Sequence, residues 1–356
     1  MKVMTIVGTR PELIRLSRII PKLDKYCNHV LVHTGQNYDP NLKDIFFEEL
    51  GIRKPDYNLQ MKTPGDILTL SEYVLNVEKP DKVLILGDTN SGLSAIVAKK
   101  MGIPVIHLEA GNRCYDDRVP EETNRRVIDH SSDILLPYTE RSRQNLIREG
   151  IANERIFVTG NPIGEVVGSY SCKIGQSNIL HTLGVFPDRY FLATFHRAEN
   201  VDGMERLISI IDSLKHLGSQ HMVPVICSIH PHTKKRIKEF DLDTTGLTFC
   251  EPFGFLDFVH LESNAKCVIS DSGTVQEECC IFGTPNVTIR DTTERPETIE
   301  CGSNIISGIE YESVMKCVEM AIDMRDWKSP IEYRRANVSD TVVKIVCGKV
   351  FGVDNC

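Results

Sequence analysis

The chain has 356 residues, of which 41% are hydrophobic and 25% are charged, and its formal net charge at pH 7 is −8. This length exceeds the size at which a single core keeps growing, so it predicts two domains. The negative charge argues against a nucleic-acid partner, which needs a basic face. No apolar run approaches the roughly 20 residues of a membrane span, and the N-terminus does not resemble a cleaved signal. We therefore expect a cytoplasmic protein.

Twelve cysteines are scattered from Cys27 to Cys356, and none forms a CxxC pair. This distribution predicts reduced thiols that are mostly buried as small hydrophobic side chains. Cys279 and Cys280 are adjacent, but the thiolate and imidazole partners that zinc prefers are not grouped with them. The sequence therefore predicts no metal site.

Short β-branched runs alternate with segments of helical period, which is typical of parallel sheets covered by helices. In chain order, the strands predicted in the first half are 2–7, 30–33, 82–86, 105–108, 134–137 and 156–158. Those predicted in the second half are 191–194, 223–228, 247–250, 267–270, 286–289 and 304–306. Helices are expected between them, for example over 11–20, where apolar residues recur at helical spacing. The predicted class is α/β.

The alternation lapses between Gly160 and Arg189 and then restarts. We place the domain boundary there, which gives an N-terminal Rossmann-like domain over 1–165 and a C-terminal one over 186–336. The segment from Ser339 to Gly352 has apolar residues at helical spacing behind a possible serine cap, so it predicts a last helix.

Ionisable residues follow the predicted strands of the first half. In open parallel sheets, ligands bind beyond the carboxyl ends of the strands. Arg10 follows the first strand, Asp88 the third and Glu109 the fourth, and Glu121 stands at a helix start after Pro120. A helix cap also explains Asp88, and the helix dipole also favours Glu121, whereas a glutamate such as Glu109 is an uncommon cap.

The second half carries different chemistry at its strand ends. His196 and His230 each follow a strand, and the turn Asp271-Ser272-Gly273-Thr274 opens a helix in the way that suits a phosphate group. Arg290 and Arg295 add two guanidinium groups. This pattern predicts a cleft between two domains, with a phosphorylated ligand held by the second and acid/base groups supplied by the first. Carboxylates grouped around one ligand carbon can raise one another's pKa, which provides a proton donor and an acceptor at neutral pH.

Together these residues resemble the non-hydrolysing UDP-N-acetylglucosamine 2-epimerases of bacteria and archaea. The matching motifs are Gly8-Thr9-Arg10-Pro11-Glu12, Gly87-Asp88-Thr89, Glu109-Ala110-Gly111, Pro120-Glu121-Glu122-Thr123-Asn124-Arg125, His196-Arg197-Ala198-Glu199-Asn200, Asp271-Ser272-Gly273 and Arg290-Asp291-Thr292-Thr293-Glu294-Arg295-Pro296-Glu297. The resemblance implies the glycosyltransferase B-type fold, in which two Rossmann-like domains face a cleft. It further implies that the last helix, about 337–356, packs back on the first domain, that the chain forms a homodimer, and that no cofactor is needed.

The activity that the resemblance implies is inversion at C2 of a UDP-2-acetamido sugar, first of all UDP-N-acetylglucosamine to UDP-N-acetylmannosamine. UDP leaves by anti elimination to give a 2-acetamidoglucal and then adds again, in a pathway to cell-surface polysaccharide precursors. By the same resemblance, the catalytic residues are Asp88, Glu109, Glu121 and His196. The implied substrate-binding residues are Arg10, Arg113, His230, Phe258, Ser272, Gly273, Thr274, Glu278, Arg290 and Arg295. Among these, Glu278 matches the family's ribose acceptor and Phe258 its neighbour of the uracil.

Three segments depart from the pattern of the best-known members. Thr274 replaces the usual second glycine, and Gln36-Asn37-Tyr38-Asp39 lacks the run that contacts a second, activating UDP-sugar in many bacterial members. The segment 112–116 is similar to relatives that act on 6-deoxy-L-sugars or diacetamido uronic acids. These departures leave open another UDP-2-acetamido sugar as substrate. A hydrolysing epimerase and a UDP-sugar glycosyltransferase are the rival functions, and a catalytically silent UDP-sugar binder is a third, against which the presence of Asp88, Glu109, Glu121 and His196 argues.

Overall fold

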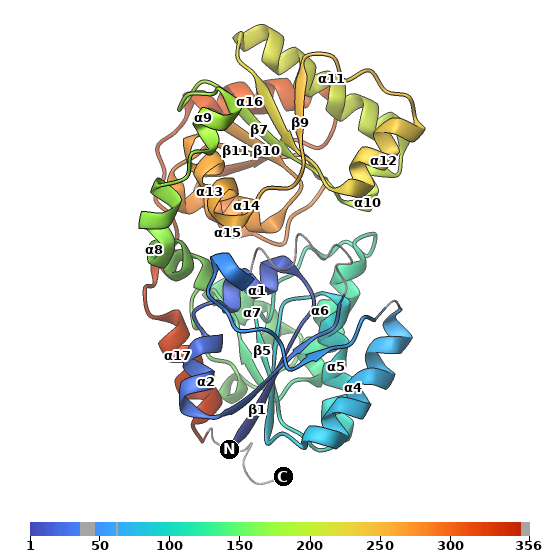
Figure 1. Cartoon of the computed structure of the whole chain (residues 1–356), viewed down its shortest axis with the longest axis vertical. Helices are drawn as coiled ribbons and strands as arrows, with labels where there is room; N and C mark the ends of the chain where they lie inside the picture. The colour runs from blue at the N-terminus through green and yellow to red at the C-terminus, as the bar shows by residue number, and fades with distance from the viewer. Residues whose placement is uncertain (36–46, 62, 350–356) are drawn as a thin grey trace. The chain divides into compact units, whose positions relative to one another are not determined.

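The structure is a computed structural model and describes residues 1–35, 47–61 and 63–349. It divides into two compact units, of which the first is Met1–Gly168 together with the segment that begins at Ile331, and the second is Ser169–Pro330. Each unit contains its own six-stranded sheet with helices on its faces (Figure 1). All pairs of neighbouring strands are parallel, so the predicted α/β class with two Rossmann-like units is confirmed.

The sheet of the first unit has the strand order β3-β2-β1-β4-β5-β6. Its strands are β1 (Lys2–Val7), β2 (Asn28–His33), β3 (Tyr57–Asn58), β4 (Lys82–Leu86), β5 (Val105–Leu108) and β6 (Ile134–Leu136). The chain moves outward in one direction from β1 and in the other from β4, so the strand order reverses between them. Because β1 and β4 are parallel neighbours, the loops that follow them start side by side at one edge of the sheet.

The sheet of the second unit repeats this topology in the order β12-β11-β10-β7-β8-β9. Its strands are β7 (Phe191–Thr194), β8 (Val225–Ser228), β9 (Leu247–Cys250), β10 (Cys267–Ser270), β11 (Asn286–Thr288) and β12 (Asn304–Ile306). Here the reversal lies between β7 and β10, where Thr194 pairs with Ser270 in the register. The loops after these two strands are therefore adjacent as well.

Helices cover the sheets and close the two cores. The first unit contains α1 (Arg10–Leu16), α2 (Ile20–Tyr26), α4 (Pro64–Glu78), η1 (Asn90–Leu93), α5 (Ser94–Lys100), α6 (Pro120–Ser131), α7 (Glu140–Arg148), η2 (Asn153–Arg155), η3 (Ile331–Arg334) and α17 (Val338–Cys347). α8 (Pro162–Gly175) runs across the division between the units. The second unit contains α9 (Ile179–Leu183), α10 (Ala198–Val201), α11 (Met204–His221), α12 (Pro231–Glu239), α13 (Phe255–Asn264), α14 (Gly273–Phe282), α15 (Pro296–Glu300) and α16 (Tyr311–Asp323).

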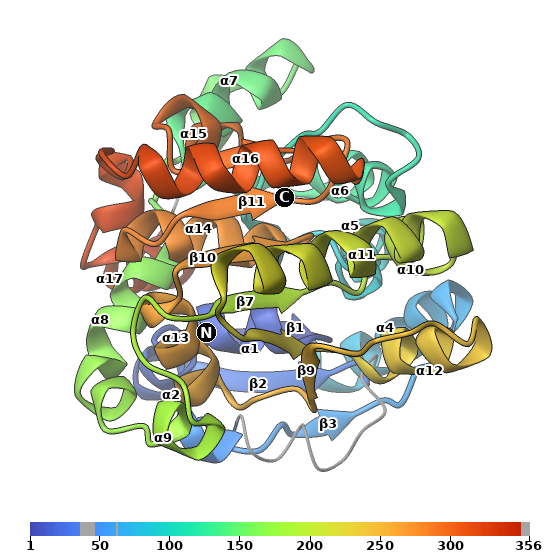
Figure 2. The ribbon, with the colours of Figure 1, turned by 90° about the horizontal axis from the view of Figure 1, so that it is seen from above.

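The cores form where apolar helix faces meet the sheets. In the first unit, residues of β1, β2, β4 and β5 pack with α4 and α5. In the second unit, α11 and α16 lie side by side over one face of the sheet (Figure 2), and their apolar side chains form one buried cluster with those of β7, β8 and β10. α13 and α14 contribute to a second cluster that includes Leu192 and Val268. These cores hold the strands in place and leave the loops at their carboxyl ends to carry polar groups.

The structure differs from the predicted elements in the first two helices. The single helix predicted over 11–20 is divided, since α1 ends at Leu16 and α2 begins at Ile20. Pro21 stands in the first turn of α2, where its missing N–H and fixed φ are tolerated because that N–H needs no partner within the helix.

Residues 156–158 are not a strand, because only Ile156 bridges to Leu135. Strand β3 was not predicted from the sequence, because two residues are too short to show the alternation typical of a strand. The stretch 160–189 contains α8 and α9. The buried Ile163, Val166, Tyr170 and Ile174 of α8 recur at helical spacing, but the glycines and serines among them obscured the pattern.

The C-terminal helix α17 packs against α2 of the first unit (Figure 1). The Lys22 ammonium group joins the two helices by contacts of 2.7 Å to the Asp340 carboxylate and 2.6 Å to the Ser339 hydroxyl. Residues 350–356, the end of the predicted helix, lie outside the described residues. Every cysteine in the described part of the chain is a free thiol. None of the described helices meets the length and hydropathy that crossing a membrane requires.

Two glycines with similar backbone angles allow a test of packing at the turn after β5. Gly111 has φ +80°, and an added Cβ would lie 2.8 Å from Leu146 Cγ and 2.9 Å from the Ser142 carbonyl carbon, both on α7. Gly111→Ala is expected to lower the free energy of unfolding by about 2–5 kcal/mol, from about 1–2 kcal/mol for the left-handed backbone and about 1–3 kcal/mol for overpacking.

Gly102 is the matched control, because its φ is +74° and an added Cβ would have no neighbour within 4 Å. Gly102→Ala is expected to cost only the backbone contribution of about 1–2 kcal/mol. Urea denaturation of both variants measures the difference. Equal losses in the two variants would contradict a steric role for α7.

Candidate active site

The predicted acidic residues of the first unit lie at the carboxyl edge of its sheet. Ile6 of β1 pairs with Ile85 of β4, so the turn before Arg10 lies beside the loop that carries Asp88. Glu109 follows β5, the next strand of the sheet. The chain thus brings Arg10, Asp88 and Glu109 to one edge, as the strand-end pattern predicts. Glu121 lies in the first turn of α6, behind Pro120.

Glu109 is held rigidly by buried partners. Its φ of +75° is unusual for a residue with a side chain, and such strained positions concentrate at functional sites. The Arg15 guanidinium group lies 2.6 Å from its carboxylate, and both side chains are buried. The Tyr138 hydroxyl and the Asn112 amide donate to the same carboxylate at 3.2 and 3.3 Å. The orientation of this carboxylate is therefore fixed by three separate segments of the chain.

Asp88 is linked to α6, the helix whose first turn contains Glu121. Arg125 Nε donates to the Asp88 carboxylate at 2.8 Å, and the Asn124 amide donates to the Asp88 carbonyl oxygen at 2.9 Å. Arg125 also donates to Glu122 at 2.7 Å. Burial acts to raise the pKa of Glu122, but hydrogen bonds from the Cys114 N–H and from Arg125 bring that pKa below its ordinary value. The loop after β4 and the start of α6 are thus held together by one arginine.

Arg113 points into the protein. Its guanidinium group lies 2.8 Å from the Asp129 carboxylate and 2.6 Å from the Glu149 carboxylate, and its side chain is fully buried. Asp129 also contacts the His107 ring at 2.7 Å. Burial opposes the charged form of Arg113, but these two carboxylates raise the pKa of Arg113 overall. Asp129 belongs to α6, and Glu149 is the residue that follows α7. Because the guanidinium group is buried between these two acids, the arrangement disfavours the substrate contact predicted for Arg113.

Glu12 is a polar residue of this edge that the sequence analysis did not assign to the site. Its side chain is buried, and its carboxyl group contacts Gly8, Thr9 and Thr89. Burial raises the pKa of Glu12 to about 7, against the lowering effect of these hydrogen bonds. The position of Glu12 two residues after Arg10 could have indicated that it belongs to this edge. Its contact with Thr89 could not be recognised, because the two residues are 77 positions apart in the sequence.

In the second unit, His196 lies at the reversal of the strand order. Its backbone N–H donates to the Asp271 carboxylate at 3.0 Å, and its ring Nδ1 lies 3.4 Å from the same carboxylate. The His196 side chain is 50% exposed, whereas that of Asp271 is fully buried. Its ring lies 6.5 Å from the ring of His230. The buried acid thus fixes an accessible imidazole, although Asp271 was not among the predicted site residues.

The turn before α14 has the form of an anion-binding site. Ser272 precedes the helix, and among the described residues its hydroxyl caps none of the helix N–H groups. Gly273 leaves no room for a side chain, because an added Cβ would lie 2.5 Å from a Glu294 carboxylate oxygen. A helix start of this kind presents backbone N–H groups and the positive end of the helix dipole to an anion, and Thr274 is the next residue of this turn.

The arginines of the 290–295 segment are paired with acids. Arg290 lies 2.8 Å from Glu294, and Arg295 forms an ion pair with Glu277 of α14. All four side chains are buried. These pairs hold the segment against α14 and reduce the positive charge that the sequence analysis expected to face a phosphate group.

Glu278 lies further along α14, and its side chain is buried close to Glu262 of α13. Burial, and next the negative charge of Glu278, raise the pKa of Glu262 well above its ordinary value. Phe258 of α13 packs on the apolar cluster that includes Val275 and Cys279 of α14. The predicted partners of ribose and uracil thus come from two helices that are in contact.

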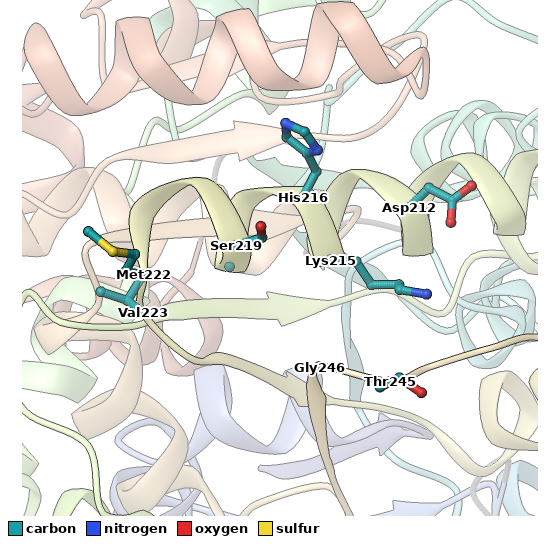
Figure 3. A pocket seen from close by; sticks show the side chains of 9 residues that line it. Asp212, Lys215, His216, Ser219, Met222, Val223, Thr245 and Gly246 are labelled. Carbon is teal, nitrogen blue, oxygen red and sulfur yellow. The ribbon is translucent and has the colours of Figure 1, made fainter.

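A pocket of about 640 Å³ opens elsewhere in the second unit (Figure 3). It is lined by residues of α11 such as Lys215 and by Thr245 and Gly246, which precede β9. The pocket thus lies toward the amino ends of the strands and is not the predicted site. In the described ranges, no group of three or more His, Cys, Asp or Glu side chains is placed to hold a metal ion. The segment 36–39 lies outside the described residues.

Two doubly wound α/β units, with acids at one reversal of strand order and His, Ser and Gly residues at the other, define a Rossmann-like enzyme of two units. A family model described as UDP-N-acetylglucosamine 2-epimerase matches residues 22–347. The chain belongs to this family of isomerases, which confirms the resemblance found in the sequence.

Similar proteins match over nearly the whole chain. The UDP-N-acetylglucosamine 2-epimerase of Methanocaldococcus jannaschii is 43% identical, with 97% of this chain and 99% of the relative covered. A crystal structure of that enzyme in complex with UDP-GlcNAc and UDP has a TM-score of 0.92 over 97% of this chain and 99% of the other. The UDP-2,3-diacetamido-2,3-dideoxy-D-glucuronate 2-epimerase of Pseudomonas aeruginosa is 36% identical over 90% of this chain and 92% of its own.

The buried pair of Arg15 and Glu109 leads to a prediction about stability. Arg15→Met leaves the Glu109 carboxylate buried without its cationic partner, so it is expected to lower the free energy of unfolding by about 3–5 kcal/mol. Adding Glu109→Gln removes the uncompensated charge and should recover part of this loss. Urea denaturation of the wild type, both single variants and the double variant gives the coupling energy. Additive losses would show that the two side chains do not stabilise each other.

Proposed function

We propose that this chain catalyses epimerisation at C2 of a UDP-2-acetamido sugar, with interconversion of UDP-N-acetylglucosamine and UDP-N-acetylmannosamine as the first candidate. The observation that carries the proposal is the placement of Asp88, Glu109 and Glu121 around one reversal of strand order in a member of this family. The relative from M. jannaschii, whose crystal structure contains UDP-GlcNAc and UDP, supports the choice of substrate.

In this proposal, the second unit holds the nucleotide. The N-terminus of α14, with the Ser272 hydroxyl and the backbone beside Gly273, receives the diphosphate, and His196 lies beside it. Glu278 accepts hydrogen bonds from the ribose, and Phe258 contacts the uracil. Preorganised N–H groups and a helix dipole stabilise the negative charge that the diphosphate gains as its bond to C1 breaks.

The first unit supplies the proton transfers. One group removes the proton from C2, the electron pair forms the C1–C2 double bond, and the electrons of the C1–O bond leave with UDP. UDP then adds again at C1 while a second group returns a proton to the other face of C2. Two groups are needed because one cannot reach both faces of a flat intermediate. Asp88, Glu109 and Glu121 are the candidates for these two groups.

A second substrate is favoured by one comparison. The relative from P. aeruginosa is named for a diacetamido uronate, and the departure at segment 112–116 resembles such relatives. A UDP-linked diacetamido uronic acid is therefore the second candidate, and a 6-deoxy-L-sugar is the third. Our proposal also includes a homodimer and a role in supplying polysaccharide precursors, both of which rest on the resemblance. It further includes a cytoplasmic location, which rests on the sequence pattern.

Solvent isotope incorporation tests the reaction. Incubation with UDP-N-acetylglucosamine in heavy water is expected to give UDP-N-acetylmannosamine with deuterium at C2, because the proton removed from C2 exchanges with solvent before a proton returns. Mass spectrometry and proton NMR measure the label. Free N-acetylmannosamine as the main product would favour a hydrolysing enzyme, and transfer to an added acceptor would favour a glycosyltransferase. Absence of label with every UDP-2-acetamido sugar of a panel would exclude the epimerase.

Substitutions test the acid/base groups. Asp88→Asn and Glu121→Gln are each expected to lower kcat by about 100-fold or more, because positioned proton-transfer groups contribute at least this much. UDP affinity, measured by calorimetry, should stay unchanged, since the nucleotide is held by the second unit. Glu140→Gln at the exposed start of α7 is the matched control. Parallel loss of UDP binding and turnover would mark Asp88 and Glu121 as structural.

A further inference from the structure

Glu12 places a buried carboxyl group between two loops at the carboxyl edge of the first sheet. It is 2% exposed. Its Oε2 accepts the Gly8 N–H at 2.6 Å, and its Oε1 lies 2.6 Å from the Thr89 hydroxyl and 3.1 Å from the Thr9 hydroxyl. Gly8 and Thr9 belong to the turn between β1 and α1, and Thr89 belongs to the loop after β4. One side chain therefore cross-links the two loops that start at the reversal of strand order.

The two loops are packed together without a gap near this carboxyl group. Thr34 and Ser91 contact each other through their hydroxyls at 2.7 Å beside Gly8. A Cβ added to Gly8 would lie 2.5 Å from the Thr34 hydroxyl oxygen and would clash with the Ser91 hydroxyl. Because the turn fits so closely, a change in the contacts of Glu12 is transmitted to the backbone of both loops.

We propose that Glu12 is a positioning residue for the epimerase reaction: its carboxyl group ties the turn that leads to Arg10 to Thr89, and so fixes the backbone of Asp88. The inference rests on the proposed function, in which Asp88 transfers a proton. Arg125 holds the side chain of Asp88 from α6, whereas Glu12 holds the adjacent residue from α1. Asp88 is thus fixed from two sides.

The proton on Glu12 sets the direction of the neighbouring hydroxyl groups. When Glu12 is charged, the Thr9 and Thr89 hydroxyls both donate their protons to it. When it is neutral, its own O–H donates a hydrogen bond to one of these hydroxyls, which then donates its hydrogen to another acceptor. Burial raises the pKa of Glu12 to about 7, so both forms are populated near neutral pH.

Other charged or ionisable groups lie on the elements around Glu12. They are Arg10 and Arg15 on α1, His33 at the end of β2, Asp88 after β4 and Glu109 after β5. Arg15 pairs with Glu109, and Asp88 pairs with Arg125. A substitution confined to Glu12 therefore isolates the contribution of this carboxyl group from that of its charged neighbours.

The sign of the stability change follows from the raised pKa of Glu12. The folded protein binds this proton more tightly than the unfolded chain, whose glutamate titrates near 4.5. The contribution of Glu12 to stability is therefore full below pH 4.5 and is lost as the pH rises through about 7. Glu12→Gln cannot titrate, so the difference in unfolding free energy between the wild type and this variant should change over that range.

The decisive experiment compares pH profiles of kcat and kcat/KM for the wild type, Glu12→Gln, Glu12→Ala and Thr89→Val. Glu12→Gln keeps the shape and mimics the neutral carboxyl group, so it should lose the component of the wild-type profile that titrates near pH 7. Glu12→Ala and Thr89→Val break the cross-link and are expected to lower kcat by about 10- to 100-fold, since small displacements of a reacting group cost this much. KM and UDP affinity should change little.

Thr69→Val on α4 and Glu140→Gln on α7 are the matched controls, because both side chains are exposed. A Glu12→Gln profile identical to that of the wild type, or full turnover by Thr89→Val, would overturn the inference. If Glu12→Ala does not fold, the other two variants still decide. A wild type that is inactive on every UDP-sugar would refute the proposed function instead, and the stability profile would then test the titration of Glu12 separately.

Discussion

The structural constraint on which the site depends is the reversal of strand order in each parallel sheet. Between β1 and β4, and again between β7 and β10, two loops leave neighbouring strands in opposite directions and create room for polar groups. The apolar cores fix the strands, so the position of each polar residue follows from how soon it comes after its strand. Glu109 comes directly after β5, and Asp88 comes two residues after β4. Neither has freedom to move far from the edge of the sheet.

Buried pairing gives this edge its rigidity. Glu109 is matched by Arg15, Asp88 by Arg125 and Asp129 by Arg113, and the arginines of these pairs are almost completely buried. Such pairs contribute little net stability, because desolvation offsets most of the Coulomb attraction. Their consequence is geometric, because each carboxylate is held in one orientation. The proton transfers proposed for Asp88 and Glu109 would require such fixed groups. The left-handed backbone at Gly87, Glu109 and Gly111 belongs to the same tightly constrained turns.

The sequence predicted the elements whose signals are local. Most strands were recognised because a short apolar run between turns is visible in the sequence itself, and the strand ends then located Asp88, Glu109, His196 and Ser272. The direction in which each side chain points could not be predicted from the sequence. Arg113 turns inward because Asp129 and Glu149 come from segments 16 and 36 residues further along, and Glu12 meets Thr89 across 77 residues. Pairings of this kind have no periodicity, so they emerge only when the fold brings the segments together.

The same topology carries different residue types at the strand ends of the two units, with Asp88 and Glu109 in the first and His196, Ser272 and Gly273 in the second. The proposed reaction gives a reason for this difference. A diphosphate that must leave C1 and then add again has to be held, yet it cannot be bound so tightly that it is trapped as free UDP. Arg290 and Arg295 are paired with Glu294 and Glu277. In the proposed reaction, binding of the diphosphate at α14 would therefore depend more on N–H groups, hydroxyls and the helix dipole than on these two cations. Uniformly stronger cationic binding would stabilise the intermediate state with UDP as much as the transition state and would not increase turnover. The buried acids beside these arginines therefore fit a leaving group that is also the returning nucleophile.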